Sequence, residues 1–344
     1  MRYLVNGFGG YFGGIVRVHN AVCRELAYRG TVEVANAPQD QEDVAGVRIL
    51  TRQDSSRLHS FLRDIRDSLR LRRYDVRIDT APAFRMLTRA RKHIVIVHDL
   101  NFLVPEVHDI SRKQYWYRKV LHHWTLRRVD RIVVNSHATL REIERFLPSA
   151  APKVRVLPLP VDYLAEHIRD DVRHSGSSES VRLLSFGHAA NKGVDRLLEL
   201  MAMDSRYSLT VVSPQDKWQE FWASSVERLQ LSDRIHLLAG LSDEDLADEY
   251  HRADVFCMLS TYEGYGLPVA ESLYLARPTV VSDLPVLAET SRGAATVAGS
   301  DAASLLAALQ AAQARPRQHW LDSAELFRDW TWRTWTDDML EGIA

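Results

Sequence analysis

The chain is predicted to fold as an α/β protein with two doubly wound domains, and three observations support that prediction. It has 344 residues, which is more than one typical domain contains. Short β-branched runs alternate with amphipathic helical stretches, as in parallel sheets flanked by helices. The alternation stops in a polar, turn-rich stretch that ends at Ser180 and then resumes, as expected when a linker joins two domains.

The expected elements follow from this alternation. Strands of the first half cover Tyr3–Val5, Val32–Ala35, Ile94–Val97, Ile132–Val134 and Val154–Leu157. Strands of the second half cover Val181–Phe186, Leu209–Val212, Ile235–Leu238, Val255–Leu259 and Thr279–Val281, with helices at Asp195–Met203, Asp243–Arg252 and Pro268–Ala276. We therefore predict domains at residues 1–163 and 181–322, a linker at 164–180, and a tryptophan-rich helical tail at 323–344 that must bury its apolar face.

Composition argues against several classes of protein. The formal net charge is −1, which argues against non-specific nucleic-acid binding as the main function. Cys23 and Cys257 lie in apolar stretches without metal-type spacing, so we expect reduced core residues of a cytosolic protein. The N-terminus lacks the apolar region of a signal peptide, and no segment has the apolar length of a membrane span. We therefore expect a cytoplasmic location.

One short motif carries most of the functional information. Glu263 and Glu271 bracket a turn in which Gly264 and Gly266 let the backbone approach a ligand closely. Pro268 suits the first position of the following helix, and the amides before it favour an anion such as phosphate. Carboxylates beside an anion site suit sugar or ribose hydroxyls, so the motif indicates a nucleotide sugar. The alternative is an ordinary strand–turn–helix with acidic residues that offset the helix dipole.

A second loop of the same half carries a positive charge. Gly187 and His188 follow a predicted strand, and Lys192 and Gly193 precede the next helix. A lysine there is a compact charge for a diphosphate, although most loop lysines are simply solvated. Because both loops follow strands of one parallel sheet, we expect them to converge on one site.

The glycine-rich loop after the first strand leaves two interpretations open. Gly13 and Gly14 precede a helix that carries Arg17. A dinucleotide-binding fingerprint is excluded, because Phe12 occupies its third glycine position and the second strand ends in Asn36 rather than an acidic residue. The loop therefore either passes close to a phosphate or is a structural turn.

Polar residues follow two further strands of the first half. His98 and Asp99 end one strand, where an imidazole can donate to a substrate or act as an acid–base group. A lone histidine is more often structural. Asn135, Ser136 and His137 end the next strand and either cap the following helix or face an acceptor.

Two basic stretches, residues 61–77 and 111–130, are rich in arginine, and the second is also rich in aromatic residues. Most such runs are solvated helix faces whose aromatic residues enter the core. Contact with anionic lipid head groups is a less frequent alternative. Contact with RNA is the least frequent.

These motifs together give the chain a resemblance to the family-4 retaining glycosyltransferases of the GT-B type. The resemblance runs from Gly-Gly-Ile-Val-Arg at 13–17 through His98-Asp99 and the Lys192 loop to the run from Leu241 to Leu273. The most specific signature is the pair of glutamates around Glu-Gly-x-Gly-Leu-Pro. The resemblance implies two Rossmann-like domains that face each other across a cleft.

The resemblance also implies roles for the matching positions. Glu263 would hold hydroxyls of the donor sugar, Glu271 would bind the ribose, and Lys192 with nearby amides would hold the leaving diphosphate. The implied donor site comprises Gly13, Gly14, Arg17, His188, Lys192, Glu263, Gly264, Tyr265, Gly266, Leu267 and Glu271. His98, Asp99 and Asn135 would face the acceptor, and His98, Glu263 and Lys192 would be catalytic. The tail would be the family's C-terminal helix, which crosses back to the N-terminal domain.

The chain departs from the family pattern beside the lysine. Many members have arginine where this chain has His188, and the loop from Gly187 to Lys192 is shorter by one residue. A neutral imidazole supplies less charge than a guanidinium, so weaker or pH-dependent diphosphate binding is expected.

The predicted reaction is transfer of a sugar from a nucleoside-diphosphate donor to an acceptor hydroxyl with retention of configuration. No Asp-x-Asp metal motif appears near a strand end, so we expect no metal or other cofactor. By analogy, the acceptor is a glycan, a lipid-linked molecule or a small molecule in surface polysaccharide, lipopolysaccharide or glycoside biosynthesis, with membrane-surface contact as an option and no nucleic acid. The alternatives are a nucleotide-sugar epimerase or phosphorylase, or a non-catalytic nucleotide-sugar-binding protein.

Overall fold

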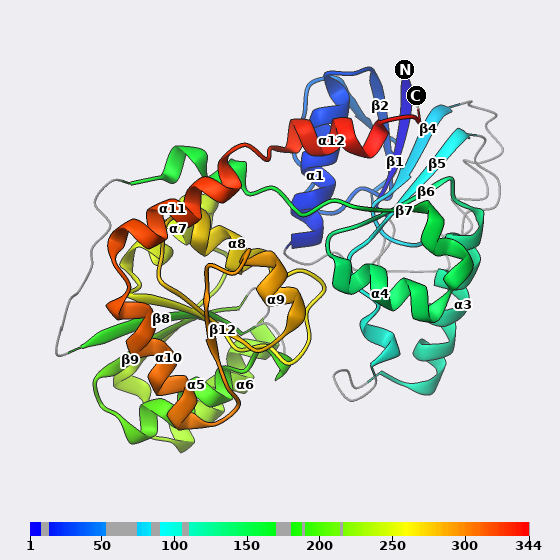
Figure 1. The fold of residues 1–344 in the computed structure, drawn as a ribbon. Helices are drawn as coiled ribbons and strands as arrows, with labels where there is room; N and C mark the ends of the chain where they lie inside the picture. Colours follow the sequence, from blue (N-terminus) through cyan, green and yellow to red (C-terminus); the bar gives the residue numbers. More distant parts are fainter. Residues whose placement is uncertain are drawn as a thin grey trace. The chain divides into compact units, whose positions relative to one another are not determined.

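The computed structural model describes residues 1–7, 14–52, 74–83, 90–104, 110–169, 180–187, 190–213 and 216–343. The chain divides into two compact units, of which the first is Met1–Leu159 with Trp332–Ala344 and the second is Pro160–Thr331. Each unit is a parallel sheet with flanking helices (Figure 1). The predicted α/β class with two Rossmann-like domains is therefore confirmed.

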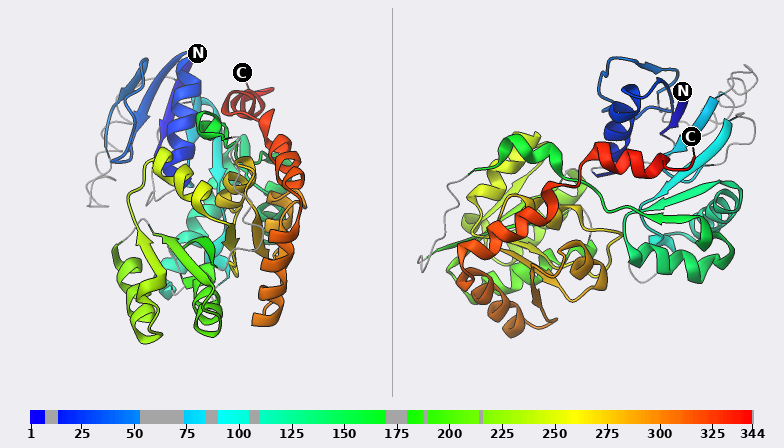
Figure 2. Two further views of the ribbon diagram at one scale, coloured as in Figure 1. Left: turned by 90° about the vertical axis from the view of Figure 1, so that its left-hand side faces the viewer. Right: turned by 45° about the horizontal axis from the view of Figure 1, so that its top comes forward.

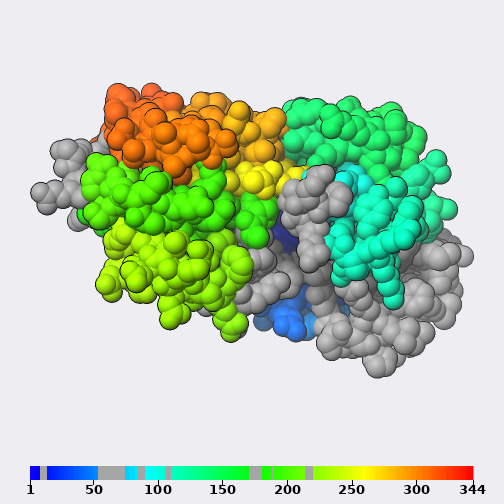
Figure 3. Space-filling model, turned by 90° about the horizontal axis from the view of Figure 1, so that it is seen from below, coloured from blue at the N-terminus to red at the C-terminus, as the bar shows by residue number. Residues whose placement is uncertain are grey.

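The sheet of the first unit has seven described strands in the order β3-β2-β1-β4-β5-β6-β7, and every neighbouring pair is parallel. The strands are β1 (Arg2–Asn6), β2 (Thr31–Ala35), β3 (Val47–Ile49), β4 (Tyr74–Asp79), β5 (Ala90–Val97), β6 (Arg131–Val134) and β7 (Val154–Val156). The helices are α1 (Gly14–Ala27), α3 (Arg112–Arg128) and α4 (His137–Phe146), with short 3-10 helices η1 (Asn101–Leu103) and η2 (Pro148–Lys153). The strand order reverses at β1 and β4, which is the doubly wound pattern. Residues of α3 form part of the surface of this unit (Figure 3).

The strand β4 was not predicted, although it lies at the centre of this sheet. Its charged residues Arg77 and Asp79 are buried, and the guanidinium donates two hydrogen bonds to the carboxylate at 2.9 and 2.7 Å. Asn6 and His93 donate to the same carboxylate at 2.9 and 2.7 Å. Buried charges are tolerated when they are paired and hydrogen-bonded in this way. The interpretation of residues 61–77 as a basic helix face is therefore wrong for residues 74–77, and residues 61–73 lie outside the described ones.

The sheet of the second unit has six described strands in the order β10-β9-β8-β11-β12-β13, all parallel. Figure 2 shows the ribbon from two further sides. They are β8 (Val181–Phe186), β9 (Tyr207–Val212), β10 (Ile235–Leu238), β11 (Val255–Met258), β12 (Thr279–Ser282) and β13 (Thr296–Ala298). The helices are α5 (Val194–Met203), α6 (Asp216–Arg228), α7 (Asp243–Arg252), α8 (Leu267–Tyr274), α9 (Pro285–Thr290), α10 (Ala302–Ala314) and α11 (Arg317–Arg328). Short 3-10 helices are η3 (Asp162–His167), η4 (Ala190–Lys192) and η5 (Ser232–Arg234).

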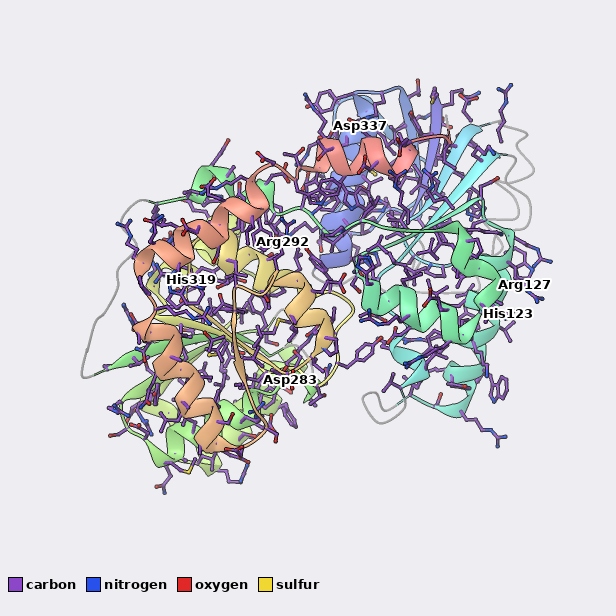
Figure 4. The ribbon with its side chains drawn as sticks, viewed as in Figure 1. His123, Arg127, Asp283, Arg292, His319 and Asp337 are labelled. Atoms are coloured by element: carbon purple, nitrogen blue, oxygen red, sulfur yellow. The ribbon has the colours of Figure 1, made fainter. Side chains whose placement is uncertain are left out.

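The C-terminal helix α12 (Trp332–Leu340) belongs to the first unit and lies beside α1. Trp335 is fully buried and its indole donates to the Leu157 carbonyl at 3.2 Å. Asp337 pairs with Arg29 at 2.7 Å (Figure 4). Helix α12 thus buries its apolar face within the first unit. Residues 323–331, which we expected in this tail, belong instead to the second unit.

The connection between the units differs from the predicted linker at 164–180, because the second unit begins at Pro160. Leu164 in η3 is fully buried, and the His167 carbonyl accepts a hydrogen bond from His251 of α7 at 2.8 Å. These contacts fix η3 on the second unit. Residues 170–179 of the predicted linker lie outside the described residues.

Both cysteines are buried and unpaired with each other, as expected for core residues. In the parts of the chain that the structure describes, no helix combines the length and the apolar character needed to cross a membrane.

Candidate functional site

The candidate site lies where the strand order of the second sheet reverses, between β8 and β11. Ligands of doubly wound proteins bind outside the carboxyl ends of the strands at such a reversal. The segment after β8, residues 187–193, is called the lysine loop below, and the segment after β11, residues 259–266, is called the glycine turn. Both segments leave the sheet at this edge.

The two segments are in direct contact. The Thr261 amide donates to the Asn191 carbonyl at 2.9 Å, and the Asn191 side chain donates to the Tyr262 carbonyl at 3.0 Å. Gly193 has a φ of 69°, and a Cβ at this position would lie 2.2 Å from the Leu259 carbonyl oxygen. Only a glycine lets the lysine loop pass this close to the glycine turn.

Lys192 and Glu263 form the centre of the contact. The lysine Nζ donates to Glu263 Oε1 at 2.6 Å, and the Ser260 hydroxyl donates to the same oxygen at 2.7 Å. The two side chains are only 9% and 10% exposed, so Lys192 is not the solvated loop lysine of the alternative interpretation. Among the described residues no donor contacts Glu263 Oε2, which leaves that oxygen for the hydroxyl of a ligand.

The glycine turn leads directly into α8. Gly266 has a φ of 90°, and a Cβ there would lie 2.7 Å from the Leu287 side chain. The Thr290 hydroxyl donates to the Tyr265 carbonyl and holds the turn in place. Gly266 is the N-cap of α8 and gives the helix no side-chain cap. The Val269 amide donates to the Gly266 carbonyl at 2.9 Å, and Pro268 has no amide N–H. The Leu267 amide is therefore the group of α8 that suits an anion at the helix N-terminus.

Glu271 has surroundings unlike those of Glu263. It lies on α8, is 3% exposed, and accepts a hydrogen bond from the Tyr250 hydroxyl at 2.8 Å on Oε2. The Tyr163 hydroxyl donates to Oε1. One carboxylate of the motif is thus paired with a cation, whereas the other is held by two neutral phenols. This difference fits separate ligands for the two glutamates.

The remaining predicted donor residues are placed as follows. Gly14 is the first residue of α1 and is exposed, and Arg17 lies on the same helix and is half-buried. Gly13 and His188 lie outside the described residues. Neither the fingerprint-like loop nor the His188 departure is therefore tested by the structure.

His98 follows β5 and its Nε2 donates to the Thr80 carbonyl at 2.9 Å. Because a carbonyl only accepts, the proton is on Nε2 and Nδ1 is the acceptor nitrogen of the neutral ring. Burial lowers the pKa of His98, against the opposing effects of the Thr80 carbonyl and the Asp99 charge. The ring is thus neutral near pH 7 and offers Nδ1 as a hydrogen-bond acceptor.

Asp99 and Asn135 make local contacts. Asp99 accepts from the Asn101 amide at 3.0 Å, and Asn135 is buried beside the Thr139 hydroxyl at 3.5 Å. Ser136 is the N-cap of α4 and accepts from the Thr139 amide at 3.1 Å, so the capping alternative holds for this residue. The acceptor roles of His98, Asp99 and Asn135 stay predictions.

Sequence reasoning missed four residues of the site. Ser260, Asn191, Tyr163 and Tyr250 contact the predicted residues, but none of the four was itself predicted to be a site residue. Ser260 has a weak signal, since it lies three residues before Glu263 in the same turn. The tyrosines have none, because their contacts with Glu271 depend on how η3 and α7 pack.

Within the described ranges, no group of three or more histidine, cysteine or acidic residues is placed to hold a metal ion. The Asp-Glu-Asp run at 243–245 begins α7, where Asp245 forms a capping box with Ser242. Its role in that helix is structural.

Buried histidines make the first unit sensitive to acid. Burial lowers the pKa of His19 to about 4, although the Gln41 hydrogen bond opposes the shift, and burial likewise lowers the pKa of His122 to about 4. Unfolding restores a pKa near 6.5, so the unfolded chain takes up protons first as the pH falls. The resulting stability is fully present above about pH 6.5 and is lost as the pH falls toward 4, by about 3 kcal/mol for each histidine.

Urea denaturation at several pH values between 7.5 and 4.5 measures this loss. His19→Gln is expected to flatten the decline, and His236→Gln, which changes an exposed histidine of the second unit, is expected to leave it unaltered. An equal decline in His19→Gln and the wild-type protein would contradict the assignment of the acid sensitivity to His19.

The fold and the site together define a class of protein, the GT-B glycosyltransferases. Residues 12–163 match the family model described as Glycosyltransferase Family 4, and residues 170–314 match the model described as Glycosyl transferases group 1. The chain therefore belongs to the family-4 glycosyltransferases.

Two curated relatives are mannosyltransferases. The chain is 26% identical over 198 residues to the MMP alpha-(1->4)-mannosyltransferase of Mycolicibacterium hassiacum, a match that covers 53% of this chain and 46% of the relative. It is 28% identical over 247 residues to the O-antigen chain mannosyltransferase B of Escherichia coli, a match that covers 68% and 64%. The chain thus spans less than two thirds of the length of either relative.

Solved structures share the fold over nearly the whole chain. Sucrose-phosphate synthase from Thermosynechococcus elongatus has a TM-score of 0.72 at 19% identity, covering 99% of this chain and 97% of that one. WaaG, a glycosyltransferase involved in lipopolysaccharide biosynthesis, has a TM-score of 0.73 at 16% identity, covering 99% and 100%. Anabaena HepE in complex with UDP and glucose has a TM-score of 0.73 at 15% identity, covering 99% and 98%.

Proposed function

We propose that the protein transfers a sugar from a nucleoside-diphosphate donor to an acceptor hydroxyl with retention of the anomeric configuration. The observation that carries the proposal is the direct contact of Lys192 with Glu263, at 2.6 Å, where the lysine loop meets the glycine turn. This contact lies at the strand-order reversal, where doubly wound proteins bind nucleotides. The mannosyltransferase relatives and the UDP complex of HepE support the same class of donor.

The contacts indicate which residue binds each part of the donor. A diphosphate near the N-terminus of α8 attracts Lys192, because a dianion outcompetes a single carboxylate for a buried ammonium. Glu263 is then released to accept hydroxyls of the sugar, and its Oε2 is already without a donor among the described residues. Glu271, whose carboxylate is held by the hydroxyls of Tyr250 and Tyr163, accepts the ribose hydroxyls.

The anomeric configuration is retained if the leaving diphosphate oxygen takes the proton of the attacking acceptor hydroxyl. This transfer occurs on the face of the sugar from which the diphosphate departs. The protein then supplies charge stabilisation rather than an acid–base pair. We propose that Lys192 and the dipole of α8 supply this positive charge without a metal ion. His98, Asp99 and Asn135 are proposed to face the acceptor, which is a glycan, a lipid-linked molecule or a small molecule of surface polysaccharide, lipopolysaccharide or glycoside biosynthesis.

A nucleotide panel followed by an assay of transfer tests the function. One of UDP, GDP, ADP and dTDP is expected to raise the melting temperature, because a bound ligand stabilises the folded state. The corresponding sugar nucleotide is expected to give a product with the donor's anomeric configuration by NMR. An epimerised or phosphorolysed sugar from donor alone would favour the epimerase or phosphorylase, and binding without turnover would favour a non-catalytic protein.

We also propose that α3 contacts an anionic membrane surface from the cytoplasmic side. Trp116, Tyr117 and Val120 are 50%, 43% and 54% exposed, and the helix has no acidic residue. The ammonium of Lys119 lies 5.1 Å from the centre of the Trp116 ring. His123 and Arg127 lie one turn apart further along the helix (Figure 4). Exposed aromatic side chains among cations suit the interface of an anionic bilayer.

Sedimentation with phosphatidylglycerol-containing vesicles checks this proposal. The wild-type protein is expected to bind in low salt, and Trp116→Ser with Lys119→Glu is expected to reduce binding about tenfold, since each basic residue contributes about 1 kcal/mol near such a surface. Phe221→Ser in the second unit is a matched control, because Phe221 is a similarly exposed aromatic residue, at 47%. Equal loss in the control would contradict a role for α3.

A further inference from the structure

The two tyrosines that hold Glu271 are unequal. Tyr250 of α7 is fully buried, and its hydroxyl lies 2.8 Å from Glu271 Oε2 and 3.1 Å from the Pro268 carbonyl. Tyr163 of η3 is half-buried and donates to Oε1. The Oε2 side of the carboxylate therefore faces the protein interior, whereas the Oε1 side faces the more accessible tyrosine.

This asymmetry determines how a ligand reaches Glu271. The inference rests on the proposed function, in which a ribose hydroxyl donates a hydrogen bond to this carboxylate. A ribose that comes from solvent meets the Oε1 side, because Tyr250 closes the other. Tyr163 and the ribose hydroxyl are both donors, and each needs the same oxygen.

We propose that Tyr163 is a specificity-determining residue that competes with the donor ribose for Glu271. When no nucleotide is bound, the phenol satisfies the buried carboxylate, which would otherwise lack a donor on that side. When a nucleotide binds, its ribose hydroxyl replaces the phenol. A ligand without ribose hydroxyls cannot replace it, so the contact favours ribonucleotides over analogues that lack these groups.

We infer that the exchange requires rotation of the Tyr163 side chain alone, without movement of η3. The neighbouring Leu164 is fully buried, and the His167 carbonyl is bonded to His251 of α7 at 2.8 Å, so η3 itself is anchored. Arg169 adds an ion pair with Asp248 on α7. The exchange leaves the number of charges unchanged, because a neutral hydroxyl replaces another.

Tyr163→Phe removes the competing hydroxyl and keeps the ring. Its dissociation constant for the tightest-binding of UDP, GDP and ADP is expected to be about tenfold lower than that of the wild-type protein, since the site is no longer mostly occupied by the phenol. The constant for the matching 2′,3′-dideoxynucleotide is expected to stay unchanged. Tyr250→Phe is a matched control on the buried side, and it is expected to weaken ribonucleotide binding because Glu271 loses its anchor.

Isothermal titration of the three proteins with both probes tests the proposal. Tighter binding of the ribonucleotide alone by Tyr163→Phe supports it. Unchanged or weaker ribonucleotide binding by Tyr163→Phe, or an equal gain for the dideoxynucleotide, would overturn it while leaving the proposed function intact. If neither the wild-type protein nor Tyr163→Phe binds any of the three nucleotides or dTDP, the proposed function fails together with this inference. Binding of dTDP alone would overturn the inference and leave the proposed function intact.

Discussion

Replacing Glu263 by glutamine, or Lys192 by methionine, is expected to lower turnover of the donor by about 10²- to 10³-fold. Losses of this size accompany removal of one group that stabilises charge in a transition state. Lys192 would no longer stabilise the leaving diphosphate, and a neutral amide at 263 would hold the sugar hydroxyls less tightly. Steady-state kinetics with the donor found in the nucleotide panel gives the measurement.

The ion pair changes what these variants do to stability. The structure shows side chains only 9% and 10% exposed, so each single variant leaves the other charge buried without its partner. Such a loss costs about 3–5 kcal/mol for a fully buried pair, and less where some water reaches it. The single variants are therefore expected to be destabilised as well as inactive.

The double variant Lys192→Met with Glu263→Gln separates the two effects. It removes both charges together, so its free energy of unfolding is expected to return toward that of the wild-type protein, while its turnover stays low. Near-normal turnover in either single variant would refute the assignment of these residues. Recovery of turnover in the double variant would show that the singles failed only through misfolding.

Gly193→Ala is expected to destabilise the second unit by about 2–4 kcal/mol and to weaken nucleotide binding. The glycine has a φ of 69°, and an added Cβ would lie 2.2 Å from the Leu259 carbonyl oxygen. An alanine at position 193 would fit only if the lysine loop moved away from the glycine turn. Lys192 would move with this loop.

Gly240→Ala is the matched control for this prediction. Gly240 has a similar φ of 65°, but nothing lies within 4 Å of an added Cβ. Its cost is therefore limited to the left-handed backbone, about 1–2 kcal/mol. Urea denaturation and nucleotide titration of both variants measure the difference. Equal stability and equal affinity in the two would contradict the claim that the loops must touch at Gly193.

The strands that bear the site could be predicted from sequence because they are apolar and β-branched. Predictions for residues 181–186 and 235–238 agree with β8 and β10 at both ends. Strand β4 was not predicted because its charged residues are paired inside the protein, and no local sequence pattern reveals such a pairing. The strands β3 and β13 were not predicted, and each has three residues, too few to show a period. The equally short β7 was found, as part of the predicted strand at Val154–Leu157.

The candidate site could be predicted only where a local sequence motif marks its residues. Glycines and glutamates at fixed spacing indicate a turn and its ligands, so Lys192, Glu263 and Glu271 were found from the sequence alone. The pairing of Lys192 with Glu263 was not, because it joins residues on separate loops that meet only in the fold. The contact of Tyr163 with Glu271 is equally non-local, since η3 and α8 are far apart in the chain.

A crystal structure of the protein with the tightest-binding nucleoside diphosphate would show whether the lysine loop and the glycine turn bind the donor. We expect the diphosphate within hydrogen-bond distance of Lys192 and the amides at residues 265–267, with a ribose hydroxyl on Glu271 in place of Tyr163. A nucleotide bound away from the lysine loop and the glycine turn, with the Lys192–Glu263 pair undisturbed, would contradict it.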